Sequence, residues 1–199
     1  MVSPDYLAVL TRVAMAAESG LTLPKGEEVV KALLEAEKAN KQQKVSYEFE
    51  SIAGQWRLCF VTGAKKSKKK AGIILGKGFY IPKLTFVGIS FNLTDKAKFR
   101  GEIGNQVKIG SLSLQLSGPA QWQNKKNLLA FDFNQALVKL FNTNIYSGGI
   151  RGGKSKSEDF YDQSIAKQAF FAFFLVTDDF IAARGKGGGL ALWKKENFK

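Results

Sequence analysis

The spacing of apolar residues changes at Gly54, and this change constrains the fold more than any other feature of the sequence. Before Gly54 the apolar residues recur every three or four positions, which is the period of an amphipathic helix. From Gly54 onward they alternate with polar residues or form short runs between turn residues, which is typical of β-strands. The sequence therefore predicts a mainly β, α+β protein in which helices precede an antiparallel sheet.

Two helices are predicted in residues 1–44. The first is expected to begin after Ser3, a good N-cap residue, with Pro4 at its first position, and to end at Gly20. The second begins near Pro24 and carries an apolar stripe on one face. We expect both helices to pack against the following sheet, although a hairpin that binds a partner protein has the same pattern.

Short strands follow at regular spacing in residues 54–195, so we expect a single domain built on an antiparallel barrel of about eight to ten strands. The predicted strands are 56–62, 71–75, 79–82, 84–92, 97–103, 106–116, 128–134, 170–177, 180–184 and 189–194. Turn residues separate them, including Gly104-Asn105 and Ser117-Gly118-Pro119. Residues 135–150 show mixed spacing that predicts no regular element.

Phenylalanine is frequent, with 16 residues against five tyrosines and three tryptophans. Strict alternation places Trp56, Leu58 and Phe60 on one face of the first strand, which we take as the inward face. A barrel of about eight strands either fills itself with side chains or holds one small ligand, so the inward aromatic residues line a core or a cavity. The residues expected to contact a ligand in such a cavity are Trp56, Leu58, Phe60, Phe86, Phe131, Phe133 and Phe173.

The composition excludes several kinds of chemistry. The chain has no histidine, so a Ser-His-Asp triad, a Cys-His pair and the commonest metal ligand are absent. The single cysteine, Cys59, cannot form an internal disulfide and is expected to be a small packed side chain. No pair of nucleophile and base stands out by spacing, so we expect a protein that is not an enzyme and holds no metal or cofactor.

The net charge of +13 predicts an anionic partner. The basic clusters are Lys65, Lys66, Lys68, Lys69 and Lys70 in one loop, and Arg151 and Lys154 in a glycine-rich segment. Such lysines attract anionic lipid headgroups by about 1 kcal/mol each, but a solvated loop has the same composition. They also suit nucleic acid binding, although the aromatic residues are not interleaved with the basic ones as stacking platforms would be.

No segment predicts a transmembrane helix, so the membrane association that the lysine loop suggests is expected to be peripheral. The longest apolar run, residues 169–176, is far shorter than the roughly 20 residues that a spanning helix needs. The first residues carry no basic or arginine-rich region typical of a targeting signal.

Both ends of the predicted sheet resemble a known family. Gly54-Gln55-Trp56 resembles the glycine-x-tryptophan that opens the first strand of lipocalin-like barrels. Residues 54–62, with the helix before them, are similar to the opening of the plastid lipid-associated proteins, the fibrillins of plants and cyanobacteria. Residues 178–194 are similar to the closing D-x-R-x-x-R-G-x-x-G-like motif and last strand of that family, although Ile181 replaces the first arginine. Residues 83–167 do not align with the family by inspection.

This resemblance implies a lipocalin-like barrel that binds or carries an apolar small molecule, such as a prenylquinone, a carotenoid or an acyl lipid, without catalysis. It implies a place on the cytoplasmic or stromal side of a thylakoid-type membrane, to which the lysine loop would dock. By motif position, Gly54 and Trp56 would shape the closed end of the barrel, and Arg184, which precedes Gly185, would lie against the Trp56 ring. The alternative is a basic module that binds nucleic acid or protein and whose barrel interior is a plain core.

Overall fold

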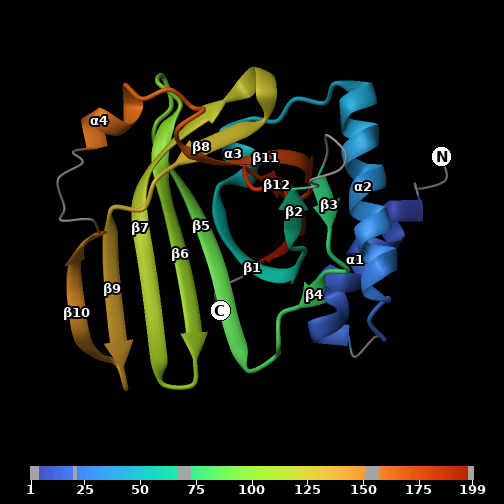
Figure 1. The fold of residues 1–199 in the computed structure, drawn as a ribbon, viewed down its shortest axis with the longest axis horizontal. Helices are drawn as coiled ribbons and strands as arrows, with labels where there is room; N and C mark the ends of the chain where they lie inside the picture. Colours follow the sequence, from blue (N-terminus) through green and yellow to red (C-terminus); the bar gives the residue numbers. More distant parts are fainter. Residues whose placement is uncertain (1–4, 20–21, 67–72, 151–156, 197–199) are drawn as a thin grey trace.

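The computed structural model of the chain describes residues 5–19, 22–66, 73–150 and 157–196 (Figure 1). Its helices are α1 (Asp5–Ser19), α2 (Gly26–Gln43), α3 (Phe49–Ile52) and α4 (Ser157–Tyr161). Its strands are β1 (Gly54–Val61), β2 (Ala64–Lys66), β3 (Ile73–Leu75), β4 (Phe79–Tyr80), β5 (Thr85–Asp95), β6 (Arg100–Ile109), β7 (Leu112–Gln123), β8 (Leu128–Phe131), β9 (Gln135–Leu140), β10 (Thr143–Gly149), β11 (Ala169–Val176), β12 (Phe180–Gly185) and β13 (Leu190–Lys195). The two N-terminal helices and the mainly β class are as predicted.

Eight of the described strands close into an antiparallel barrel. They run in the order β7-β6-β5-β1-β13-β12-β11-β8, and the pairing of β8 with β7 completes the ring. The predicted antiparallel barrel is therefore confirmed. Strand β4 pairs with β1 beside the ring, and β2 and β3 form a separate small hairpin.

Strands β5, β6 and β7 are longer than the others and extend beyond the barrel (Figure 1). One edge of β7 is shared, because residues 120–123 pair with β8 while residues 112–117 pair with β9. The β9–β10 hairpin thus continues the sheet away from the ring. We call β9, β10 and the adjoining ends of β5, β6 and β7 the wing. The wing includes the mixed segment 135–150, where a bulge between Asn144 and Tyr146 interrupts the alternation.

Two predicted turns lie inside strands. Gly104 is in the middle of β6, and Gly118 is in β7. Both glycines permit a close approach, because a Cβ at Gly104 would collide with the Ser90 hydroxyl and a Cβ at Gly118 would collide with the Asp132 carbonyl oxygen. The chain instead turns between β6 and β7 at Gly110, whose φ of +57° suits glycine.

Helices α1 and α2 cover the outer face of the barrel at β1, β11, β12 and β13 (Figure 1). Their apolar stripes bury Leu10, Val13 and Leu33 against outward-facing strand residues. The strand partners are Phe60, Phe174, Phe180, Ala182, Leu190 and Leu192. Each large side chain buried in this layer stabilises the fold by about 1.5–3 kcal/mol. The expected packing of the helices on the sheet is confirmed.

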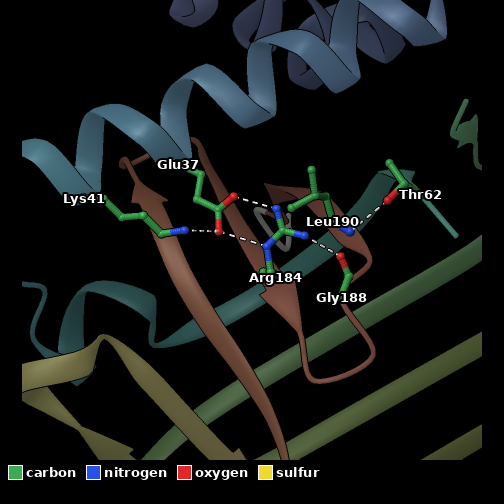
Figure 2. Close-up of polar contacts among 6 residues, drawn as sticks. All are labelled: Glu37, Lys41, Thr62, Arg184, Gly188 and Leu190. Atoms are coloured by element: carbon green, nitrogen blue, oxygen red, sulfur yellow. Dashed lines mark hydrogen bonds and ion pairs between the residues drawn. The ribbon is translucent and has the colours of Figure 1, made fainter. Parts of the chain in front are cut away.

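A largely buried ion pair joins α2 to the end of β12 (Figure 2). Arg184 donates from Nε and Nη2 to the two carboxylate oxygens of Glu37, at 2.9 and 2.5 Å, and from Nη1 to the carbonyl of Gly188. Beside it, the Thr62 hydroxyl accepts a hydrogen bond from the Leu190 N–H at 2.9 Å. Polar contacts therefore fix the helix layer to the turn between β12 and β13.

Replacing Glu37 with glutamine is expected to lower the free energy of unfolding by about 1.5–3 kcal/mol at neutral pH, since Arg184 loses its charged partner. Hydrogen bonds from Arg184 hold the pKa of Glu37 below its usual value of 4.5. A carboxyl group with a lowered folded-state pKa stabilises the fold above its unfolded-state pKa, and the contribution is lost as the pH falls. Denaturant titrations should show the difference between wild type and E37Q shrinking as the pH falls from about 5 to about 3.

Glu35 provides a matched control on the same helix, because its side chain is exposed and, among the residues that the structure describes, pairs only with the exposed Lys31. E35Q is expected to change the free energy of unfolding by less than about 0.5 kcal/mol at every pH. Equal effects of E35Q and E37Q would contradict the role of the buried pair.

Candidate functional site

The inward face of the barrel is a packed core. Of the residues predicted to line a ligand cavity, Trp56, Phe131 and Phe173 lie in this core, and Leu58 and Phe133 pack against it. The rings contact one another: Phe131 stacks on Phe171 with 4.9 Å between ring centroids, and Phe173 meets Phe91 edge to face at 5.8 Å. These aromatic side chains fill the space that the predicted ligand would occupy.

Helix α3 closes one end of the barrel. Phe49 and Ile52 belong to the interior core and are 1% and 0% exposed. The Trp56 indole N–H donates to the Ile52 carbonyl at 2.8 Å, and the Trp122 indole N–H donates to the Tyr47 carbonyl at 3.3 Å. Because buried indoles need an acceptor, the segment that leads into β1 satisfies both tryptophans and seals this end.

Phe60 faces outward, so its predicted inward position is wrong. In the pairing of β1 with β13, Leu58 stands opposite Trp193 and Phe60 opposite Leu192, so the register shifts around Cys59. This bulge reverses the alternation of side chains beyond Leu58. Phe60 consequently packs against α1 and α2.

Phe86 also faces outward. Its ring covers Gly88, where an added Cβ would meet the ring at 2.6 Å, and lies under the Arg57 guanidinium at 5.4 Å. Arg57 stands opposite Gly88 on the outer face, whereas Ile89 belongs to the interior core. Residue 86 therefore has the outward parity of β5, because side chains alternate strictly along this part of the strand.

The predicted contact between Arg184 and the Trp56 ring is also wrong. Arg184 lies on the outer face of β12, where it binds Glu37 of α2. The cation near the Trp56 ring is Lys195, whose Nζ lies 5.4 Å from the ring centroid. Lys195 is the strand partner of Trp56 in β13, which explains why it and not Arg184 reaches the ring.

The two motif glycines have backbone roles. Gly54 begins β1 with a φ of +123°, a conformation that only glycine adopts readily. The Gly185 N–H donates to the Gly189 carbonyl at 2.9 Å in the turn that follows β12. Both residues shape the ends of strands.

Most of the predicted anion-binding residues fall outside the described part of the chain. Lys68, Lys69, Lys70, Arg151 and Lys154 are not among the described residues. Lys65 and Lys66 belong to β2, of which only the backbone is described. Their role in docking stays a prediction.

The wing carries a row of exposed apolar residues that the sequence patterns did not single out. The loop before β5, the β6–β7 turn and the β9–β10 turn lie along one edge of the molecule (Figure 1). Register confirms the row, because Thr85 pairs with Ile109, Ile109 with Leu112, and Leu112 with Leu140. We call this surface the hairpin edge. Its apolar members are Leu84 (92% exposed), Ile109 (58%), Leu112 (46%), Leu140 (39%) and Phe141 (77%).

Phe141 occupies a strained position in the hairpin edge. It and Asn142 have φ values of +47° and +64° in the β9–β10 turn, which favours asparagine and glycine. A bulky residue in this left-handed conformation costs about 1–2 kcal/mol. An aromatic residue whose backbone is strained and which is 77% exposed points to a functional role.

Lysines flank the hairpin edge. Lys83 precedes Leu84, and Lys108 and Lys139 lie one residue inward from the edge on β6 and β9. None of the three forms an ion pair with another described residue. The edge therefore combines apolar tips with uncompensated positive charge.

The sequence held a signal for this edge in the turn composition. Leu84, Ile109 and Phe141 occupy loops or strand ends, where polar residues are usual, although the sequence pattern predicts them within strands or an irregular segment. Their exposure follows from the wing, which lies beyond the ring of the barrel.

A small crevice lies between α1 and the outer face of β1. It has a volume of about 160 Å³, with Val13, Ala16, Leu23 and Tyr80 among its apolar walls. Arg57, Lys83 and Lys194 also line it. Its volume is below the roughly 300 Å³ of a typical small-molecule site, so the crevice can hold only one part of an apolar molecule.

Two kinds of feature are absent from the described residues. No three His, Cys, Asp or Glu side chains gather where they would hold a metal ion. None of the described helices is long and apolar enough to cross a membrane.

The fold and its surface define an eight-stranded antiparallel barrel with an apolar, lysine-flanked edge. No family model matches the chain, and no curated protein matches it. Two solved structures show weak likeness. A redesigned β-barrel has 7% identity and a TM-score of 0.35 over 75% of this chain and 95% of its own. A deswapped triple mutant of bovine odorant-binding protein has 13% identity and a TM-score of 0.32 over 74% and 76%. The barrel assignment rests on the strand pairing.

Cys59 is expected to react slowly with thiol reagents in the folded protein. Burial raises the pKa of its thiol to about 11, so at about pH 8 only about one molecule in a thousand carries the reactive thiolate. Reaction with Ellman's reagent should be more than about 100-fold slower than in denatured protein, because both access and thiolate fraction are low. Equal rates in the native and denatured states would contradict the outward but covered position of Cys59.

Proposed function

We propose that the protein is a non-catalytic peripheral protein that docks on an anionic lipid surface through the hairpin edge. The observation that carries this proposal is the row of exposed apolar side chains at the ends of three neighbouring chain turns. A lipid surface suits this row, because the tips lie at one edge and are flanked by lysines.

The charge and the apolar tips supply the two contributions that stable peripheral binding needs. A lysine near an anionic surface contributes about 1 kcal/mol, so Lys83, Lys108 and Lys139 alone give weak binding. Full burial of a Leu, Ile or Phe side chain contributes about 1.5–3 kcal/mol, so partial insertion of Leu84 and Phe141 adds a comparable amount. No Asp or Glu occurs in residues 83–87, 106–115 or 137–146 to repel an anionic headgroup.

The resemblance to the plastid lipid-associated proteins supports the same class of partner. We propose membership of that family from residues 54–62 and 178–194, and with it a place on the cytoplasmic or stromal face of a thylakoid-type membrane. The lysine run at residues 65–70 would add to the attraction.

Binding to vesicles should depend on the hairpin edge. Wild-type protein is expected to co-sediment with vesicles of phosphatidylcholine and phosphatidylserine and to bind pure phosphatidylcholine much less. L84S/F141N should bind at least about tenfold more weakly, because it removes the two most exposed apolar tips. F141N alone should leave the fold as stable or raise the free energy of unfolding, because asparagine tolerates the left-handed conformation at this turn.

Two variants outside the edge provide controls. L34S is the control for L84S/F141N, because it removes an exposed apolar residue of α2. K31Q/K38Q on α2 is the control for K108Q/K139Q in the edge, because each double variant removes two positive charges. Both controls should bind vesicles more tightly than their counterparts in the edge. Wild-type binding by L84S/F141N would overturn the proposal, as would equal binding to neutral and anionic vesicles. Loss of self-association in L84S/F141N without loss of vesicle binding would assign the edge to a second copy of the chain.

We propose the crevice beside α1 as the place where an apolar small molecule binds. Its walls are apolar, and Arg57 and Lys83 at its lining suit a ligand with an anionic end. A prenylquinone, carotenoid or long acyl lipid is larger than the crevice, so only one end of such a molecule would enter.

Decanoate provides a defined probe of the crevice. Native mass spectrometry should show a complex of one decanoate with one chain, and A16F should abolish it, because the added ring fills the crevice. A8F places the same ring on the exposed face of α1 and should bind decanoate as the wild type does. Failure of the wild type to bind, or unchanged binding by A16F, would contradict this assignment.

A further inference from the structure

A second and larger hollow lies on the outer face of the wing. It has a volume of about 480 Å³, within the usual range for small-molecule sites. Register places its polar side chains on the face opposite the barrel interior: Gln106 and Gln115 pair across β6 and β7, and Gln135 pairs with Ser117 across β9 and β7. Gln55 of β1 adds a fourth glutamine at the far wall.

The lining is almost free of charge. Among the described residues around the hollow, Glu196 is the only ionisable one, although the chain carries 30 Lys and Arg residues. The remaining polar groups are amides and hydroxyls. The nearest cation, Arg57, lies 4.0 Å from Glu196 and 5.4 Å from the Phe86 ring centroid and is engaged with both, so the hollow favours a neutral, polar ligand.

Two glycines of β5 and β6 form part of the floor of the hollow, each beneath a neighbouring side chain. Gly104 lies directly under the Ser90 hydroxyl, and a Cβ at that position would collide with it. Gly88 lies under the Phe86 ring in the same way. The two glycines therefore keep the floor at backbone level and let a hydroxyl group and an aromatic ring project over it.

Several polar groups in the hollow are available to a ligand. Among the described residues, Gln106 donates to Ser113 at 3.4 Å, whereas the amides of Gln55, Gln115 and Gln135 have no hydrogen-bond partner. The Glu196 Oε1 atom is buried without a hydrogen bond, with Arg57 at 4.0 Å. Each amide offers donors and an acceptor, which matches the paired hydroxyl groups of a sugar.

We infer that the outer hollow of the wing binds a neutral polyhydroxylated ligand, a mono- or disaccharide unit. The amides bind its hydroxyl groups, and the Glu196 carboxylate accepts from one hydroxyl. A nucleic acid fits less well, because its phosphates need several cations, and the cation beside the lining, Arg57, already faces Glu196.

The sugar can be free or part of a glycolipid. Gln106 lies three residues from Ile109, or about 10 Å along β6, so the hollow borders the hairpin edge. A headgroup at a membrane surface would be within reach of the hollow. The sugar proposal holds for either source and does not depend on anionic lipid binding.

The test uses the full chain with three neutral disaccharides: maltose, lactose and cellobiose. Saturation-transfer NMR is expected to show transfer to at least one of them. A second arm uses phosphatidylcholine vesicles with and without glucosylceramide, and glucosylceramide is expected to increase co-sedimentation only if a lipid headgroup is the source. Binding in either arm that is sensitive to the variants below supports the proposal.

The variants remove hydrogen bonding while keeping side-chain size. Q55M/Q135M changes two exposed glutamines on opposite walls, so it leaves the core untouched, and it should weaken binding about 10- to 30-fold. Q115M is the second variant, and Q42M on α2 is the control that should bind as the wild type does. Absence of binding in both arms would overturn the proposal, and so would equal binding by wild type and Q55M/Q135M. Failure of this test leaves the anionic vesicle result unaffected.

Discussion

Two β-bulges divide the aromatic residues between the barrel interior and the helix layer. In β1 the register shifts around Cys59, and in β11 it shifts between Phe173 and Leu175. Trp56 and Phe173 therefore point inward, while Phe60 and Phe174 point outward. Without this reversal the outer face would lose the large side chains that bury α1 and α2. The interior core and the helix layer thus depend on the same two irregularities.

The same bulges explain how much of the fold was predictable. Helical spacing and turn residues were sufficient for α1, α2 and most strands, because each depends on local periodicity. Strict alternation failed at Phe60, since a bulge depends on the pairing partner and leaves no local mark. The residues around Gly104 and Gly118 predict turns, although both glycines lie inside strands and permit close approach of neighbouring groups. The site was harder still, because the exposure of Leu84 and Phe141 depends on the wing and not on their neighbours in sequence.

The ring of the barrel provides stability, whereas the wing provides the surfaces that are open to a partner. The ring is filled by aromatic side chains, sealed by α3 and covered by helices, so little of it is open to a partner. The wing uses the same strands differently: β5, β6 and β7 pass from the ring into the wing, where one face carries amides and the ends carry apolar tips. A rigid barrel thereby positions an exposed sheet without contributing its own interior.

The ion pair between Glu37 and Arg184 spans 147 residues of sequence, and this has a consequence for synthesis. The apolar faces of α1 and α2 lack most of their strand partners until β11, β12 and β13 leave the ribosome, although Phe60 of β1 is made earlier. At about 5–20 residues per second, that interval lasts roughly 7–30 seconds. During it the nascent chain displays two amphipathic helices, which are good substrates for holding chaperones. The pairing of β13 with β1 and the packing of α1 and α2 on β12 and β13 thus join segments that lie far apart in the sequence.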